Sequence, residues 1–141
     1  MNDLTGKKYR LPTEAEWEFA ASGGNLSQKY KYSGSNNLKD VAWFYDNSGE
    51  CTHIVGAKSP NELGIYGMSG NVNEWCSDKF GAYLNSSQKD PKGTSSGNQR
   101  VIRGGAYNSS EGRVRILYRS SFKTGNFDSP ALGFRLVYNS N

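Results

Sequence analysis

Few side chains in this 141-residue sequence could act as nucleophiles, redox centres or soft metal ligands. The two cysteines, Cys51 and Cys76, have no CxxC or Cys/His spacing, which indicates free, partly buried thiols rather than a disulfide framework or a zinc site. The lone histidine, His53, has no second histidine with which to share a metal ion. A structural role for His53 at the solvent edge is therefore favoured over catalysis.

The segment from residue 101 to residue 137 suits recognition better than catalysis. Short apolar stretches bracket it, and the residues between them are mostly Tyr, Asn, Ser, Gly, Phe and Arg. Tyrosine gives a large contact area at low entropic cost, while Ser, Asn and Gly give adaptable hydrogen bonds, as in antibody-like binding surfaces. The alternative is an irregular surface loop without a partner. The binding surface that we predict consists of Tyr107, Asn108, Ser109, Ser110, Gly112, Tyr118, Ser120, Phe122, Phe127 and Asp128.

Arginines in the same segment are expected to support this surface rather than to form it. The guanidinium groups of Arg115, Arg119 and Arg135 can bond loop carbonyls and carboxylates through their planar forks.

The glycine-rich stretch GIYGMSGNVNEW, residues 64–75, is a candidate cation loop. Asn71 and Glu74 could supply oxygen ligands to a hard cation, and backbone carbonyls could complete the shell. The alternative is an asparagine turn followed by a surface glutamate.

One helix is predicted, over residues 13–22. Thr13 follows Pro12 and has capping-box spacing to Glu16, and acidic residues occupy the first turns, where the helix dipole favours them. Trp17, Ala20 and Ala21 fall on one face, and two glycines at 23–24 end the helix. We expect Trp17 to pack on the sheet near Trp75.

The remainder of the chain predicts short strands and long loops. Residues 9–11 and 100–103 are typical of extended segments, and 134–138 of a last strand, whereas 25–40 are rich in turn formers. The apolar stretch 41–45 fits either a strand or a packed loop.

Composition narrows the class of protein. The length indicates one domain, and a mean hydropathy of -0.76 indicates a polar surface over a modest core. The net charge is +4, but no Lys/Arg run or basic helical face accompanies it, so nucleic-acid binding is not expected. The N-terminus has no apolar run typical of a signal peptide, and no stretch is long enough to span a membrane, so membrane insertion is not expected.

Four stretches, in this order and spacing, resemble the C-terminal half of the formylglycine-generating enzyme (sulfatase-modifying factor) family. The resemblance implies an α+β, C-type-lectin-like fold for residues 1–141 as a single domain, with a small twisted antiparallel sheet, one or two helices and long irregular loops that carry function. The stretches are YRLPTEAEWEFAASGG (9–24), GIYGMSGNVNEW (64–75), RVIRGGAY (100–107) and GFRLV (133–137).

The same resemblance does not extend to the family's metal ligands. The copper enzymes bind their metal through two cysteines after the Gly-Gly motif, and those positions are Ser109 and Val114 here, neither of which is a soft thiolate. In the calcium loop Gly70, Val72 and Glu74 match, but Gly67 stands where an Asp or Asn is usual. The resemblance therefore implies no copper cofactor, and calcium binding at Gly70, Val72 and Glu74 that is weak at most.

Segment 101–137 also looks like the variable region of proteins diversified by diversity-generating retroelements in phages and bacteria. Many of its interior residue types are reachable from asparagine codons by changes at adenines, although Glu111 and Lys123 are not easily reached that way. The fixed positions would be Arg103, Gly104, Gly105, Arg115, Arg119 and 133–137.

We therefore expect a non-catalytic variable protein that binds a protein or glycan on a target cell surface. The alternatives are a formylglycine-generating-enzyme-like oxidoreductase and a structural surface or tail subunit. The sequence leaves open whether the chain forms a homo-oligomer or joins a larger phage or surface assembly, which would place it on a virion or a cell.

Overall fold

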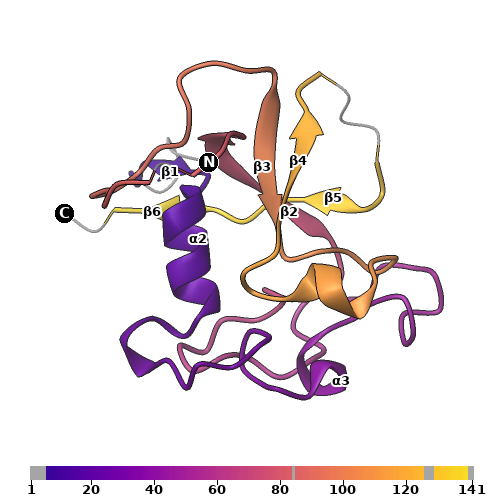
Figure 1. The fold of residues 1–141 in the computed structure, drawn as a ribbon. Coiled ribbons are helices and arrows are strands. Elements are labelled where there is room, and N and C mark those ends of the chain that lie inside the picture. The colour runs from indigo at the N-terminus through magenta and orange to yellow at the C-terminus, as the bar shows by residue number, and fades with distance from the viewer. Residues whose placement is uncertain (1–5, 84, 126–128, 140–141) are drawn as a thin grey trace.

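The computed structural model describes residues 6–83, 85–125 and 129–139. A four-stranded sheet has the order β4-β3-β2-β5, and helix α2 lies beside it, while the lower part of the molecule in Figure 1 is built largely of loops. The main sheet is formed by β2 (Asn73–Lys79), β3 (Gln99–Arg103), β4 (Arg119–Lys123) and β5 (Leu132–Gly133). The other elements are β1 (Tyr9–Arg10), α2 (Glu14–Ala21), the 3-10 helix η1 (Gly24–Leu26), α3 (Leu38–Val41), the 3-10 helix η2 (Glu111–Val114) and β6 (Val137–Tyr138).

Helix α2 begins and ends as its sequence predicts. The Thr13 side chain accepts from the Glu16 backbone N–H at 3.2 Å, and the Glu16 carboxylate accepts from the Thr13 N–H at 2.8 Å, which completes the capping box. At the other end Gly23 adopts a φ of 86°, a left-handed conformation that costs glycine little. The chain then turns into η1 and leaves the sheet.

The main core lies between α2 and the inner face of the sheet. Trp17 is only 1% exposed and packs with Ala21, Met68, Cys76 and Val101. Because side chains alternate along a strand, Glu74, Cys76 and Asp78 of β2 all point to this inner face, and all are buried.

A second core holds the loop-rich half together. Tyr32, Val41, Phe44 and Val114 are buried in one cluster, to which α3 also contributes Leu38. Val114 is the link between this cluster and the 101–137 segment. Gly105, at φ 71°, passes so close that an added Cβ would lie 2.7 Å from the Val114 side chain.

Several local predictions need correction. Trp75 lies on the outer face of the sheet, with its ring against Phe122, and not beside Trp17. Residues 25–40 were expected to be turns, but residues 38–41 form helix α3. Asn37 caps this helix, because its side chain accepts a hydrogen bond from the Lys39 N–H. Strand β5 pairs parallel with β2, so the sheet is mixed rather than purely antiparallel. The last strand, β6, is shorter than predicted and pairs with β1 at the edge of the molecule.

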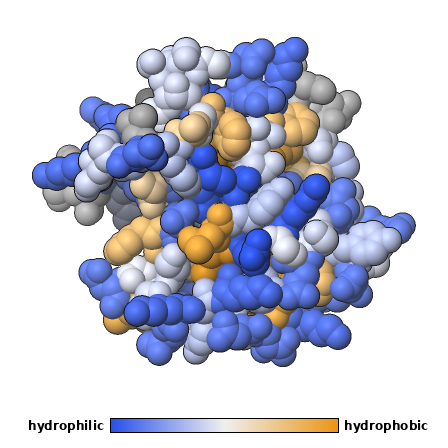
Figure 2. All heavy atoms as spheres, in the orientation of Figure 1, coloured by the Kyte–Doolittle hydropathy of each residue, from blue (hydrophilic) through white to orange (hydrophobic). Residues whose placement is uncertain are grey.

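The surface is polar, as the composition predicts. Figure 2 shows a mostly hydrophilic face with apolar patches that are separate from one another. Cys51 is exposed and Cys76 is buried, and both are free thiols. Within the described part of the chain, no helix combines the length and the apolar character that crossing a bilayer requires.

Trp17→Ala should lower the free energy of unfolding by about 3 to 5 kcal/mol, because it removes the largest buried side chain of the main core. Phe19→Ala is the matched control, since Phe19 is 57% exposed on the same helix and its loss should change stability by about 0.5 kcal/mol or less. Urea denaturation of both variants measures the difference. Equal stability of Trp17→Ala and wild type would contradict the position of Trp17.

Candidate functional site

A buried network of charges ties α2 to β3 and β4. Arg119 donates to Glu14 through two bonds of 2.8 and 2.7 Å, and Arg103 donates to the same carboxylate. Arg103 also donates to Glu18 at 2.5 Å and to the Ile116 carbonyl at 2.7 Å. One glutamate thus joins two strands that carry the predicted binding segment.

Electrostatics keep Glu14 ionised inside this network. Burial by itself raises the pKa of Glu14, but the hydrogen bond from Arg119 and the charges of Arg103 and Arg119 outweigh it, and the net pKa is below the ordinary value. Because the folded pKa is lower than the unfolded one, the pairing contributes stability above the unfolded pKa and loses it as the pH falls through the folded pKa.

A second buried carboxylate, Glu74, fixes the end of the segment. Arg135 donates two hydrogen bonds of 2.6 Å to this carboxylate, and the indole N–H of Trp17 donates a third at 2.7 Å. Arg119 and Arg135 therefore act as scaffold, which confirms the prediction for these two residues. Arg115 is exposed and makes one bond of 3.0 Å to the Gly112 carbonyl, so its supporting role is local.

The outer face of the sheet carries an aromatic surface. The Trp75 and Phe122 rings meet edge to face at a centroid distance of 6.0 Å. Strand register pairs Trp75 with Ile102 and Ile102 with Ser120, which places these side chains on the same face. Trp75 was not among the predicted surface residues, although its alternation with inward-facing Glu74 and Cys76 could have indicated it.

Backbone bonds hold the loop that follows β3. The Tyr107 N–H donates to the Asn71 carbonyl at 2.8 Å, and the Ser48 hydroxyl donates to the Tyr107 carbonyl at 2.9 Å. The Tyr45 N–H donates to the Ser109 carbonyl at 3.0 Å. The main chain of the loop is thus fixed while several of its side chains face solvent.

The structure places most of the predicted surface residues at least partly in solvent. Asn108, Ser110 and Gly112 are exposed, and half-buried positions are taken by Tyr107, Ser109, Tyr118, Ser120 and Phe122. Phe127 and Asp128 lie outside the described residues. Ser120 and Phe122 belong to β4, whereas residues 107–112 belong to the loop and η2.

Other residues of the segment anchor it. The Glu111 carboxylate accepts from the Tyr32 hydroxyl at 2.5 Å and from the Lys31 ammonium at 3.0 Å. Val114 and Ile116 are buried, each in a different core cluster. Anchors therefore alternate with exposed side chains between Glu111 and Phe122.

The residues at the two positions that correspond to the copper-ligand cysteines, Ser109 and Val114, have structural roles here. Val114 is fully buried among apolar side chains. The Ser109 hydroxyl accepts from the Ala106 N–H at 3.0 Å and so closes a turn. An aliphatic side chain and a hydroxyl offer no soft ligand for copper.

Cys51 and His53 lie side by side but are not arranged as a nucleophile and base. Their Sγ and Nε2 atoms are 4.0 Å apart, and Nε2 is 2.7 Å from the Ser48 carbonyl. A carbonyl can only accept, so Nε2 carries the proton and has no lone pair for the thiol. The ring also stacks on Trp43 at 3.8 Å, which fits the structural role predicted for His53.

The proposed calcium ligands are engaged elsewhere. Both oxygens of Glu74 accept from Arg135, and Asn71 uses its amide to exchange two bonds with the His53 backbone, at 2.8 and 3.1 Å. Glu74 is thus a buried partner of Arg135, and weak calcium binding at Gly70, Val72 and Glu74 stays a prediction. No cluster of three His, Cys, Asp or Glu side chains suited to a metal occurs among the residues that the structure describes.

Residues 3–140 match the Sulfatase-modifying factor enzyme 1-like domain, and the chain belongs to this family. Among curated relatives, the chaperone protein LppX of Paenibacillus barcinonensis is 42% identical over 92% of this chain and 49% of its own length. The formylglycine-generating enzyme of Streptomyces coelicolor is 38% identical over 89% of this chain and 45% of its own length. The chain thus spans about half the length of these two relatives.

Among solved structures, Treponema denticola variable protein 1 is similar throughout most of the chain. The TM-score is 0.84 at 42% identity, over 92% of this chain and 47% of that one. This similarity confirms the predicted fold and the resemblance to a variable protein at the level of the fold.

Arg119→Ala should lower the free energy of unfolding by about 3 kcal/mol, because it leaves a buried carboxylate with one partner fewer. Arg115→Ala should cost about 0.5 kcal/mol or less, since Arg115 is exposed. Thermal and chemical unfolding of the two variants gives the comparison. If the exposed arginine proves the more costly to remove, the scaffold has been assigned to the wrong residue.

Calcium should leave the thermal midpoint unchanged relative to chelator, because Glu74 would have to give up Arg135 to bind it. Differential scanning fluorimetry in calcium and in EGTA tests this. A clear upward shift in calcium would show that the loop at residues 70–74 rearranges to form a cation site.

Proposed function

We propose that this chain is a non-catalytic ligand-binding variable protein of a diversity-generating retroelement, and that it recognises a protein or glycan on a target cell surface. The observation that carries the proposal is the separation of the sheet into two faces. Buried ion pairs of Arg103 and Arg119 lock the inner face, while Trp75, Phe122 and Ser120 line the outer one.

A rigid frame behind an aromatic surface suits recognition. Aromatic rings that are held in place lose little entropy on binding, so more of their contact energy appears as affinity. Tyr118 directly precedes β4, and its N–H donates to the Arg115 carbonyl at 3.0 Å. Side-chain changes on this face would not disturb Glu14 and its partners on the other.

Catalysis of formylglycine formation is the second candidate, because family members carry that name. It requires a pair of soft ligands, and positions 109 and 114 provide a hydroxyl and a buried aliphatic side chain. A structural surface or tail subunit is the third candidate, and it would use the same fold without a changing ligand.

Tyr118→Ala should abolish capture of the ligand yet lower the free energy of unfolding by about 1 kcal/mol or less, because Tyr118 is half-buried. Tyr138→Ala is the control and should bind as wild type does, since Tyr138 is 46% exposed on β6, which pairs with β1 and not with the main sheet. Binding to glycan arrays and to displayed cell-surface proteins is compared for the three proteins, together with their thermal unfolding.

Two results would contradict the proposal. One is a Tyr118→Ala protein that binds as wild type does, and the other is copper-dependent turnover of a sulfatase-motif peptide. The flanking DNA gives an independent test. A near-copy of the 101–137 coding segment that differs only at adenines, beside a reverse transcriptase, is expected.

A further inference from the structure

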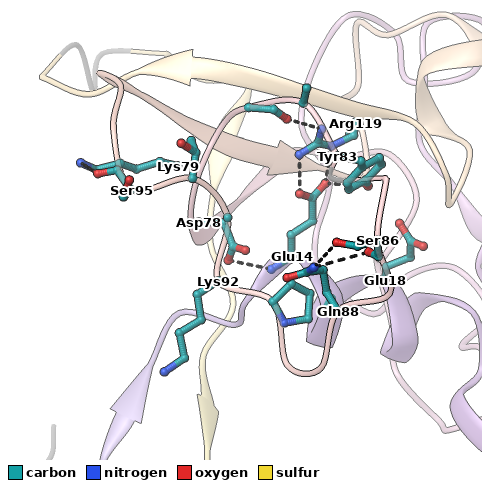
Figure 3. Close-up of a pocket in the computed structure, with 16 residues that line it drawn as sticks. Glu14, Glu18, Asp78, Lys79, Tyr83, Ser86, Gln88, Lys92, Ser95 and Arg119 are labelled. Carbon is teal, nitrogen blue, oxygen red and sulfur yellow. Dashed lines mark hydrogen bonds and ion pairs between the residues drawn. The ribbon is translucent and has the colours of Figure 1, made fainter.

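A cavity of about 770 Å³ lies between α2, the end of β2 and the chain that follows β2. Its walls include Glu14, Asp78, Tyr83 and Arg119, as Figure 3 shows. These residues belong to the inner side of the sheet, so the cavity is separate from the Trp75 and Phe122 surface. Its size is in the range of small-molecule binding sites.

Most charges around this cavity already have partners. Glu14 pairs with Arg103 and Arg119, and Glu18 pairs with Arg103, so two carboxylates balance two guanidinium groups.

Two lysines also line the cavity, and neither neutralises the carboxylates. The Lys79 ammonium donates to the Ser95 carbonyl at 3.1 Å. In Figure 3 the side chains of Lys79 and Lys92 extend away from Asp78.

Asp78 is the exception. It is 3% exposed, and one oxygen, Oδ2, accepts from the Glu14 N–H at 2.9 Å and from the Ser77 hydroxyl at 3.2 Å. No hydrogen bond to the other oxygen, Oδ1, is found among the described residues, and Oδ1 is not one of the fully enclosed atoms that lack a partner, so it faces the open space of the cavity. Burial raises the pKa of Asp78, the bonds from the Glu14 N–H and the Ser77 hydroxyl lower it, and the charges of Glu14 and Glu16 raise it again, so the net pKa is above the ordinary value.

The bond from the Glu14 N–H at the start of α2 occupies Oδ2 of Asp78, whereas Oδ1 takes no part in capping the helix. An ionised carboxylate oxygen that opens to a cavity and has no cationic partner attracts a ligand that brings positive charge and N–H donors. Tyr83 adds an aromatic wall, because it is 64% exposed and Arg119 covers one face of its ring at 4.0 Å.

We propose that the cavity binds an alkylammonium group, whose N–H donors reach Asp78 Oδ1 and whose aliphatic chain lies against Tyr83. The group could belong to a lysine side chain of a partner protein or to a free polyamine, since both present the same ammonium. The inference does not depend on the proposed function, because it concerns the opposite side of the sheet.

The test is an NMR titration of the labelled chain with 1,5-diaminopentane, N-acetyl-lysine amide and 1-pentanol. Both amines should shift the amide signals of Ala15, Asp78 and Tyr83 with a Kd on the order of a millimolar, and the uncharged alcohol should not. Tighter binding of the lysine amide would assign the site to a partner protein. Tighter binding of the diamine would assign it to a polyamine.

Asp78→Asn keeps the shape of the side chain and should weaken diamine binding by about tenfold or more. Asp46→Asn, on an exposed turn, is the matched control and should bind as wild type does. If Asp78→Asn fails to fold, Tyr83→Ala replaces it and should weaken binding severalfold.

Several results would overturn the site. They are equal binding of the diamine and 1-pentanol, wild-type affinity in folded Asp78→Asn (or in Tyr83→Ala where that variant replaces it), and shifts confined to Trp75 and Phe122. Stronger binding of a neutral sugar, methyl glucoside, at the same residues would also overturn it, in favour of a polyol site.

Discussion

The carboxylate of Glu14 is the point on which the rest of the structure depends. It is buried between Arg103 on β3 and Arg119 on β4, which lie 89 and 105 positions further along the chain. Removing one partner from such a group leaves a charge that the interior cannot solvate. In the complete network the charges of Glu14 and Glu18 balance those of Arg103 and Arg119. The helix, β3 and β4 are therefore constrained to one relative arrangement, with the Trp17 ring 5.2 Å from the Arg103 guanidinium.

This arrangement separates the residues that stabilise the sheet from those on its outer face. The residues that hold the sheet face inward, and Ser120, Phe122 and Trp75 face outward from the same strands. A side chain on the outer face can change without leaving a buried charge unpaired or a cavity in the core. A protein whose surface must vary while its fold persists needs this division, and strand alternation supplies it directly.

The same fold in this family serves proteins named as enzymes and a protein named as variable. The difference at the site is chemical rather than architectural. At position 114 a buried valine packs with Tyr32 and Phe44, and at position 109 a serine closes a turn. Both side chains stabilise the loop after β3, through apolar packing at position 114 and a closed turn at position 109.

The sequence by itself determined the elements that depend on neighbours along the chain. The capping box of Thr13 and Glu16, the apolar face of Trp17 and Ala21, and strand β3 were all predictable, because each follows from local hydrogen bonding or periodicity. Only the tertiary structure decided that Glu14 meets Arg119, that Glu74 turns inward to Arg135, and that Trp75 faces outward. Those outcomes depend on strand register and on contacts between distant segments, because buried carboxylates such as Glu14 and Glu74 find their arginine partners far along the chain.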